Sequence, residues 1–146
     1  MLKNQKGITL IALVITIIVL LILAGITIAM ISSQDSAPAK AGEGKARNAI
    51  GAAKDAINMQ AAANLSTFYE ESYVTNAATK TFASKQAAAE AAGTEGTDSG
   101  NVADIADVTT SVSSHKITIT YTAESKYTAE GTVSDTGVIT WEDKTN

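Results

Sequence analysis

The chain has 146 residues, of which 45% are hydrophobic, and its formal net charge is −4 at pH 7. This length allows one domain with an appendage. It contains no cysteine and one histidine, which excludes a disulfide scaffold, a thiolate zinc site, a cysteine nucleophile and a multi-histidine metal site. Its acidic balance argues against binding to nucleic-acid phosphates, which requires clustered Lys and Arg, so we expect no direct nucleic-acid binding.

The charged residues are distributed unevenly along the chain. There is none between Gly7 and Gln34, although the chain contains 11 Lys and Arg and 15 Asp and Glu in total. Lys3 and Lys6 precede this window, and all other charges follow it. The overall composition therefore averages two unlike parts, an apolar N-terminal rod and a small acidic body.

Residues 8–31 predict a membrane-spanning helix. Their 24 residues would form a helix of about 36 Å, and the hydrocarbon core of a bilayer measures about 30 Å. We expect Thr9, Thr16 and Thr27 to bond to carbonyls one turn earlier. Lys3 and Lys6 predict a cytoplasmic N-terminus with the body outside, a single-pass arrangement. The apolar run also exceeds the roughly 7–15 residues typical of a cleaved signal peptide.

The segment around Gly7 carries a more specific pattern, a short basic leader ending in Gly and followed at once by an uncharged helix. The sequence Lys6-Gly7-Ile8-Thr9-Leu10-Ile11-Ala12-Leu13-Val14 resembles the prepilin processing and methylation motif of type IV pilins and type II secretion pseudopilins, including pilin-like proteins of Gram-positive bacteria.

This resemblance implies that a membrane peptidase removes residues 1–7 as a leader, cutting between Gly7 and Ile8, and methylates the new amine of Ile8. It implies an assembly helix that includes Thr9, Leu10, Ile11, Ala12, Leu13, Val14 and Gly25. The implied partners are membrane lipid before assembly, the prepilin peptidase, an assembly platform with its ATPase, and copies of the chain or other pilins in a helical filament. The implied locations are the cytoplasmic membrane before assembly and a cell-surface filament afterwards.

Ala12 departs from the family pattern, which usually has Glu at this position. In the family that carboxylate is thought to pair with the terminal amine of a neighbouring subunit, and Ala12 removes the partner. Three interpretations stay open: a pilus structural subunit, a minor pilin or pseudopilin that initiates assembly or drives secretion, and a signal-anchored extracellular binding domain that does not polymerise. Gly25 has two interpretations, local melting of the helix or a close helix contact.

Residues 32–93 predict an amphipathic helix and a connecting helical segment. Pro38, Gly42 and Gly44 predict a weak break, and an apolar stripe follows at helical spacing. The stripe consists of Ala46, Ile50, Ala53, Ile57, Ala61, Leu65 and Phe68. Residues 84–92 predict a short helix that Gly93 would end. The aromatic residues expected to fill the core between helix and sheet are Phe68, Tyr69, Tyr73 and Phe82.

Residues 94–146 predict an antiparallel β-meander after a polar loop at 94–101. The expected strands are 102–108, which also fits a helical turn, then 116–122, 127–133 and 138–141, with a hairpin turn at 134–137. Together with the residue 8–31 helix and the amphipathic helix, this predicts an α+β fold, in which a long N-terminal helix packs on a small three- or four-stranded antiparallel sheet.

The sequence contains no recognisable catalytic constellation, so we expect neither enzymatic activity nor a cofactor. His115 is expected to be a polar surface residue. Asp98, Asp104 and Asp107 are weak calcium candidates that lack EF-hand spacing, so the favoured interpretation is a solvated acidic loop. A glycosylation sequon begins at Asn64, but it falls on the predicted helical stripe and is interpreted as chance.

Overall fold

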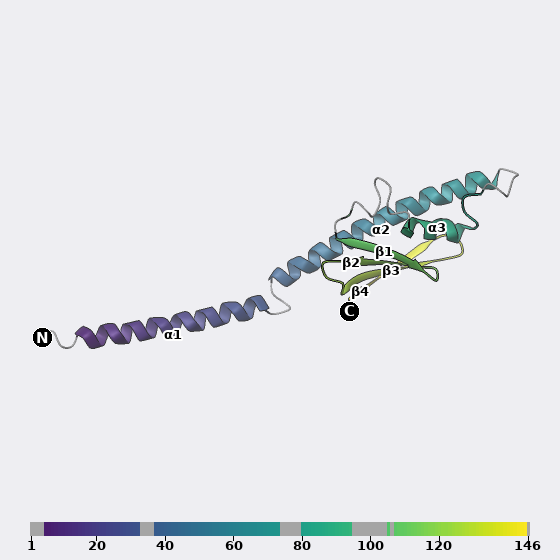
Figure 1. Ribbon diagram of the computed structural model, residues 1–146. Coiled ribbons are helices and arrows are strands. Elements are labelled where there is room, and N and C mark those ends of the chain that lie inside the picture. The colour runs from purple at the N-terminus through teal and green to yellow at the C-terminus, as the bar shows by residue number, and fades with distance from the viewer. Residues whose placement is uncertain (1–4, 33–36, 74–79, 95–104, 106, 146) are drawn as a thin grey trace. The chain divides into compact units, whose positions relative to one another are not determined.

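The computed structural model describes residues 5–32, 37–73, 80–94, 105 and 107–145, with the side chains of the first helix described from Thr9 onward. These residues form three α-helices and four β-strands, an α+β arrangement (Figure 1). The chain divides into two compact units, Met1–Gly42 and Glu43–Asn146, which we describe separately. The predicted α+β class is therefore confirmed.

Helix α1 spans Gln5–Ser32 and carries no acidic residue in its first turn and no basic residue in its last turn. Its apolar residues surround the helix instead of forming one stripe, which is the pattern of a helix in lipid or inside a bundle. Thr16 donates a hydrogen bond from its hydroxyl to the carbonyl of Leu13 at 2.7 Å, and Thr27 donates to those of Leu23 and Ala24. The prediction of such back-bonding is confirmed at these two threonines.

Helix α2 spans Ala37–Ser72. The predicted break at Pro38, Gly42 and Gly44 is wrong, because all three residues lie within α2. Pro38 fits there because the first turn of a helix needs no backbone N–H donor. The side chains that α2 buries are Ala46, Ile50, Ala53, Ile57, Ala61 and Asn64, so the predicted stripe is confirmed over its first five residues. Asn64 takes the buried place near its end, while Leu65 and Phe68 are only half-buried.

Helix α3 spans Lys85–Thr94 and begins at a capping serine. The Ser84 hydroxyl accepts a hydrogen bond from the backbone N–H of Ala87 at 3.0 Å, the standard N-cap arrangement. The prediction that Gly93 ends this helix from outside is wrong, because Gly93 lies within it and is buried. A Cβ on Gly93 would lie 2.7 Å from Cγ2 of Val112 and 2.8 Å from Cγ2 of Ile117. Gly93 therefore lets α3 approach the sheet closely.

The sheet is a four-stranded antiparallel meander in the order β1-β2-β3-β4. The strands are β1 Val108–Ser113, β2 Lys116–Tyr121, β3 Tyr127–Val133 and β4 Ile139–Thr145. The expected strands at 116–122 and 127–133 are confirmed. The predicted turn is confirmed by a hydrogen bond from the Gly137 N–H to the Ser134 carbonyl at 2.9 Å, with Gly137 at φ 82°.

Both outer strands differ from their predictions. The first strand begins at Val108 and was expected to end there, and residues 102–104 and 106 lie outside the described residues. The last strand continues to Thr145, four residues beyond its predicted end. Each difference has the same physical cause. An edge strand pairs on one side only and tolerates Thr, Ser and charged residues, so hydrophobic alternation does not mark its ends.

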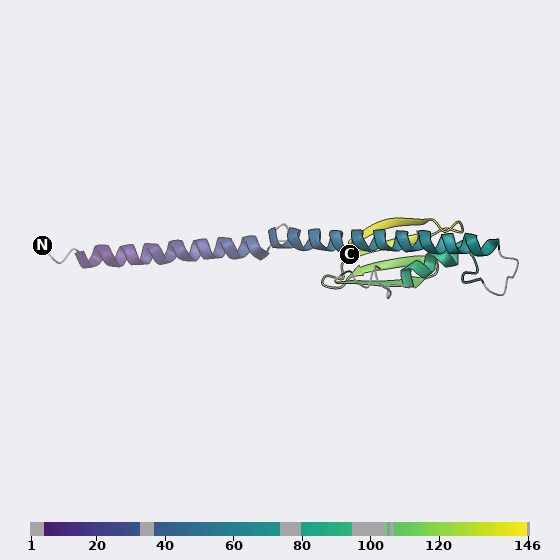
Figure 2. The same ribbon diagram turned by 90° about the horizontal axis from the view of Figure 1, so that it is seen from above.

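Helices α2 and α3 lie on one face of the sheet, as Figures 1 and 2 show. Ile57, Ile117 and Ile119 are the largest fully buried side chains and join α2 to β2. The expectation that four aromatic residues fill this core is wrong. Tyr69 and Tyr73 are 48% and 89% exposed, and Phe68 and Phe82 are half-buried. The aromatic residues buried in the described core are instead Tyr121 and Tyr127, which come from the sheet.

Candidate functional site

Helix α1 is the first candidate site, because its large apolar side chains are exposed to solvent. From Leu10 to Ile31 every large hydrophobic residue is exposed, by 46% at Val14 to 69% at Met30. The described residues contain one helical stretch long and apolar enough to cross a membrane, near the N-terminus. Exposed apolar surface on this scale needs lipid or another helix to cover it. The α1 helix therefore supports single-pass membrane anchoring.

The predicted processing residues fall at the beginning of α1. The backbone of α1 is helical from Gln5 onward, so Gly7 and Ile8 both lie within the helix. Ala12 is exposed and brings no carboxylate to this part of the helix. Cleavage after Gly7 and methylation of Ile8 stay predictions.

The helix continues through Gly25, where a Cβ would meet nothing within 4 Å. Both interpretations of Gly25, a close helix contact and local melting, stay predictions.

The calcium candidates are not brought together as a metal site. Asp98 and Asp104 lie outside the described residues, and Asp107 is an exposed turn residue with φ 63°. Among the residues the structure describes, no three His, Cys, Asp or Glu side chains are grouped so that they could hold a metal ion. The backbone carbonyl of Asp107 accepts a hydrogen bond from the N–H of Thr122 at 2.7 Å. The described role of Asp107 is thus to begin the β1–β2 pairing.

His115 and Asn64 both have structural partners. Nδ1 of His115 lies 2.5 Å from Oε1 of Glu90. The histidine side chain is 63% exposed, which confirms its predicted position at the surface. Asn64 is 5% exposed and donates from Nδ2 to the carbonyl of Ala88 at 3.0 Å. An asparagine that holds α2 against α3 in this way is inaccessible in the folded body, so the sequon does not mark a surface glycosylation site.

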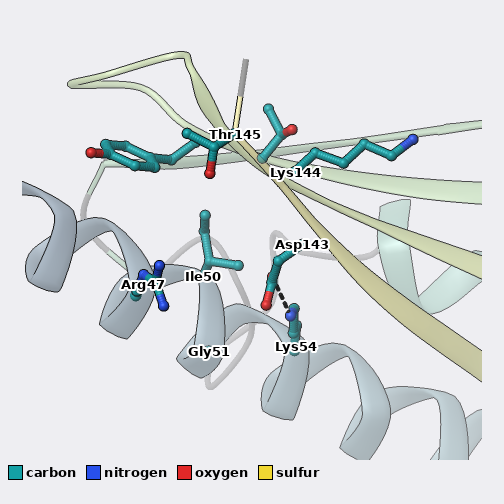
Figure 3. A pocket seen from close by; sticks show the side chains of 9 residues that line it. Arg47, Ile50, Gly51, Lys54, Asp143, Lys144 and Thr145 are labelled. Atoms are coloured by element: carbon teal, nitrogen blue, oxygen red, sulfur yellow. Dashed lines mark hydrogen bonds and ion pairs between the residues drawn. The ribbon is translucent and has the colours of Figure 1, made fainter.

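A groove between α2 and the β3–β4 hairpin is the second candidate site (Figure 3). Its volume is about 470 Å³. The nine residues that line it are Arg47, Ile50, Gly51, Lys54, Tyr127, Thr128, Asp143, Lys144 and Thr145. No sequence pattern predicts this groove, because its two walls come from segments about ninety residues apart in the chain.

The charges of the groove are already paired. Nζ of Lys54 lies 2.5 Å from Oδ1 of Asp143, the contact drawn in Figure 3. Arg47 pairs with Glu43 one helical turn earlier at 2.6 Å. Lys144 points away from α2 in Figure 3 and pairs with Glu130 at 3.0 Å. The three cations that line the groove are therefore each paired with a carboxylate.

The face of the sheet opposite the helices carries a three-residue ion cluster. Glu130 accepts hydrogen bonds from Nζ of Lys116 at 2.5 Å and from Nζ of Lys144 at 3.0 Å. These bonds lower the pKa of Glu130 below its usual value. In turn the bond to Glu130 raises the pKa of Lys116. The cluster joins β2, β3 and β4 and leaves its carboxylate ionised, so it is a structural feature and not a proton donor.

The comparisons with known proteins identify no relative. No family model, curated protein or solved structure matches the chain. Its function therefore has to be argued from its own sequence and structure.

Proposed function

We propose that this protein is a structural subunit of a type IV pilus or pilus-like filament, processed after Gly7 and polymerised through α1. The observation that carries the proposal is the exposed apolar surface of α1, uncharged from Gly7 onward. The Lys6-Gly7-Ile8 pattern lies at the beginning of this helix, which precedes an α+β body in the chain. A helix that only anchors a protein needs hydrophobicity alone. The basic leader that ends in Gly7 is an additional feature, which a peptidase can recognise.

The proposed mechanism is mechanical. Before assembly, lipid covers the apolar side chains of α1, whose backbone donors and acceptors are satisfied within the helix. In the filament the same surface is covered by the α1 helices of other copies, so burial in lipid is exchanged for burial between helices. The exchange has little net driving force, and an ATP-driven assembly machine has to extract the subunit from the membrane.

Mass spectrometry of the mature N-terminus tests this proposal. The protein from its native host is expected to begin at Ile8 with a methylated amine, and Gly7→Leu is expected to keep Met1 and stay in the membrane. Gly25→Ala is the matched control, because it changes a glycine of the same helix without a clash, and it should be processed normally. An intact Met1 in the unaltered protein, or cleavage after Ala39, contradicts the proposal.

Ala12 supports a second candidate, a minor pilin or pseudopilin that initiates assembly or drives secretion. Without a carboxylate at this position, the amine of Ile8 has to find carbonyl or hydroxyl acceptors. Counting subunits in sheared filaments separates the candidates, since thousands of copies per filament indicate the major subunit and a few at one end the minor one. If Ala12→Glu changes neither copy number nor position, Ala12 does not determine the role.

The third candidate, a signal-anchored binding domain, predicts that cells without a prepilin peptidase keep the protein fully functional at the membrane. Electron microscopy of sheared surface material, with sequencing of its N-terminus, distinguishes this outcome from both filament roles.

A further inference from the structure

The two edges of the sheet differ sharply in charge. At one edge β4 carries Glu142, Asp143 and Lys144 just before its last residue, and charged side chains of this kind normally prevent another strand from pairing with an exposed edge. At the other edge β1 has the sequence Val-Thr-Thr-Ser-Val-Ser, with no charge, no proline and no glycine. Among the described strands none pairs with the outer side of β1, and the strand itself lacks the charged residues that β4 carries.

The register of the β1–β2 hairpin shows which backbone groups of β1 face outward. Ser114 and His115 form its two-residue turn, with φ values of 50° and 64° as a type I′ turn requires. In such a hairpin the flanking residues, Ser113 and Lys116, form a hydrogen-bonded pair, and pairs of this kind then alternate along the ladder.

The same alternation continues to the beginning of the strand. Asp107 accepts the hydrogen bond from Thr122, as the pattern demands. The N–H and carbonyl groups of Val108, Thr110 and Val112 consequently point away from β2, toward the free edge. An added strand would find three donors and three acceptors there.

The β1 sequence is complementary to itself in the antiparallel direction. The five residues centred on Thr110 are Val-Thr-Thr-Ser-Val. When a second copy of β1 runs antiparallel with the two Thr110 residues opposite each other, Val108 of one copy lies opposite Val112 of the other. On the solvent face this arrangement places the hydroxyl of Thr109 opposite that of Ser111. Cross-strand pairs between β-branched residues and between hydroxyl residues are favourable ones.

Charge also favours a second copy in this orientation. Two acidic bodies repel each other, and the uncharged edge is a surface where they can meet at low electrostatic cost. The anchoring of α1 in a shared membrane raises the effective concentration of copies, which a short strand pair needs.

We propose that the free edge of β1 is a strand-addition site for a second copy of this chain, in which two β1 strands pair antiparallel about Thr110 and join two sheets into one. This pairing does not depend on processing after Gly7, so it is expected both in the unprocessed protein and in the mature one.

Cysteine cross-linking tests the register, because the chain has no cysteine of its own. Full-length Thr109→Cys and Ser111→Cys copies with different tags are produced together in membranes and mildly oxidised. In the proposed register residues 109 and 111 form a pair without hydrogen bonds, with Cα atoms about 4.5 Å apart, which suits a disulfide. The mixed disulfide is expected at least tenfold above that of a Thr140→Cys and Glu142→Cys mixture, the equivalent pair on β4. Equal yields from the two mixtures overturn the proposal.

Charge substitution at the same exposed positions provides an independent test. A copy with Thr109→Lys and Ser111→Lys, or one with both residues changed to Glu, is expected to lose at least tenfold in energy transfer between tagged copies in vesicles. Mixing the Lys copy with the Glu copy should restore the signal, because unlike charges then lie opposite each other. The unfolding midpoint of each variant verifies that the body is folded. If the mixture stays as low as the separate variants, the pairing is wrong.

The same measurements in the Gly7→Leu background separate this proposal from the filament proposal. Cross-linking that persists there while filaments are lost supports strand pairing alone. Cross-linking that disappears with the filaments contradicts the independence stated above and overturns the proposal.

Discussion

Gly93 determines how closely α3 approaches the sheet. Any side chain there would collide with Val112 and Ile117, whose methyl groups lie within 3 Å of the Cβ position. Gly51 in α2 has the opposite surroundings, since a Cβ there meets nothing within 4 Å. Two helical glycines of one body are therefore under opposite constraints. Gly93 is required by packing, whereas Gly51 only costs helix stability.

These constraints predict opposite effects of the same substitution. Gly93→Ala is expected to lower the free energy of unfolding by about 1–3 kcal/mol, because the added methyl overpacks the contact. Gly51→Ala is expected to raise it by up to about 1 kcal/mol through helix propensity. Denaturant unfolding of the full chain in detergent, followed by the fluorescence of its one tryptophan, Trp141, measures both. A Gly93→Ala protein as stable as the parent would show that α3 can move away from the sheet without cost.

Among the elements, β2, β3 and β4 are linked by the Glu130 cluster on the face of the sheet away from the helices. Its carboxylate serves two lysines from the flanking strands. All three side chains lie at the surface, where single ion pairs contribute little and salt weakens them. The cluster accordingly makes a small, pH-dependent contribution to the stability of the sheet, which is held together by the packing of its buried face.

The signs of its pKa shifts predict where stability changes with pH. Hydrogen bonds from Lys116 and Lys144 lower the pKa of Glu130 below 4.5 in the folded protein, so its contribution is present above pH 4.5 and is lost as pH falls through the lowered value. The bond to Glu130 raises the pKa of Lys116 above 10.5, so that contribution is present below pH 10.5 and is lost as pH rises through the raised value.

The unfolding midpoint measured across both pH windows checks these signs. Glu130→Gln is expected to flatten the profile at both ends, and raised salt should do the same to the parent. Asp135→Asn, at an exposed position of the β3–β4 turn, is the control and should leave the profile unchanged. An unaltered profile in Glu130→Gln would mean that the lysine pairs contribute nothing measurable.

The whole molecule separates its apolar surface from its charge. The large exposed apolar residues of α1 stand in one uncharged segment. Elsewhere in the part of the chain that the structure describes, the large hydrophobic residues that are exposed are Met59, Tyr69, Tyr73 and Val138. The described surface that requires lipid or partner helices is therefore that of α1.

Changing a valine to lysine in each of the two units, one at a time, tests whether the attachment to lipid depends on α1. Val19→Lys places a charge near the middle of α1, where membrane insertion becomes less favourable by about 2.5–3.5 kcal/mol, and the protein is expected to shift from the membrane fraction to the soluble or aggregated fraction. Val138→Lys is the control, because Val138 is 60% exposed in the body and Val19 48% in α1. It should leave membrane retention unchanged. If both variants are retained equally in the membrane fraction after alkaline extraction, the exposed apolar side chains of α1 do not hold the protein in lipid.

Features that repeat locally could be predicted from the amino-acid pattern. The uncharged run identifies α1, the three- to four-residue spacing from Ala46 to Ala61 identifies the buried side of α2, and alternation identifies β2 and β3. In each case the signal comes from residues that are close together in the sequence, so no distant part of the chain is needed to recognise the element. The α+β class followed from these elements together.

Features that depend on residues far apart in the chain could not be predicted in this way. The exposed Tyr69 and Tyr73 lie outside the core, and Lys54 meets Asp143 across a groove that no motif marks. The free edge of β1 likewise exists because the order of the strands leaves it outermost. Burial, pairing and edges are properties of which elements become neighbours. A local pattern reports what a segment can bury, and only packing decides which neighbour covers it and which surface stays open.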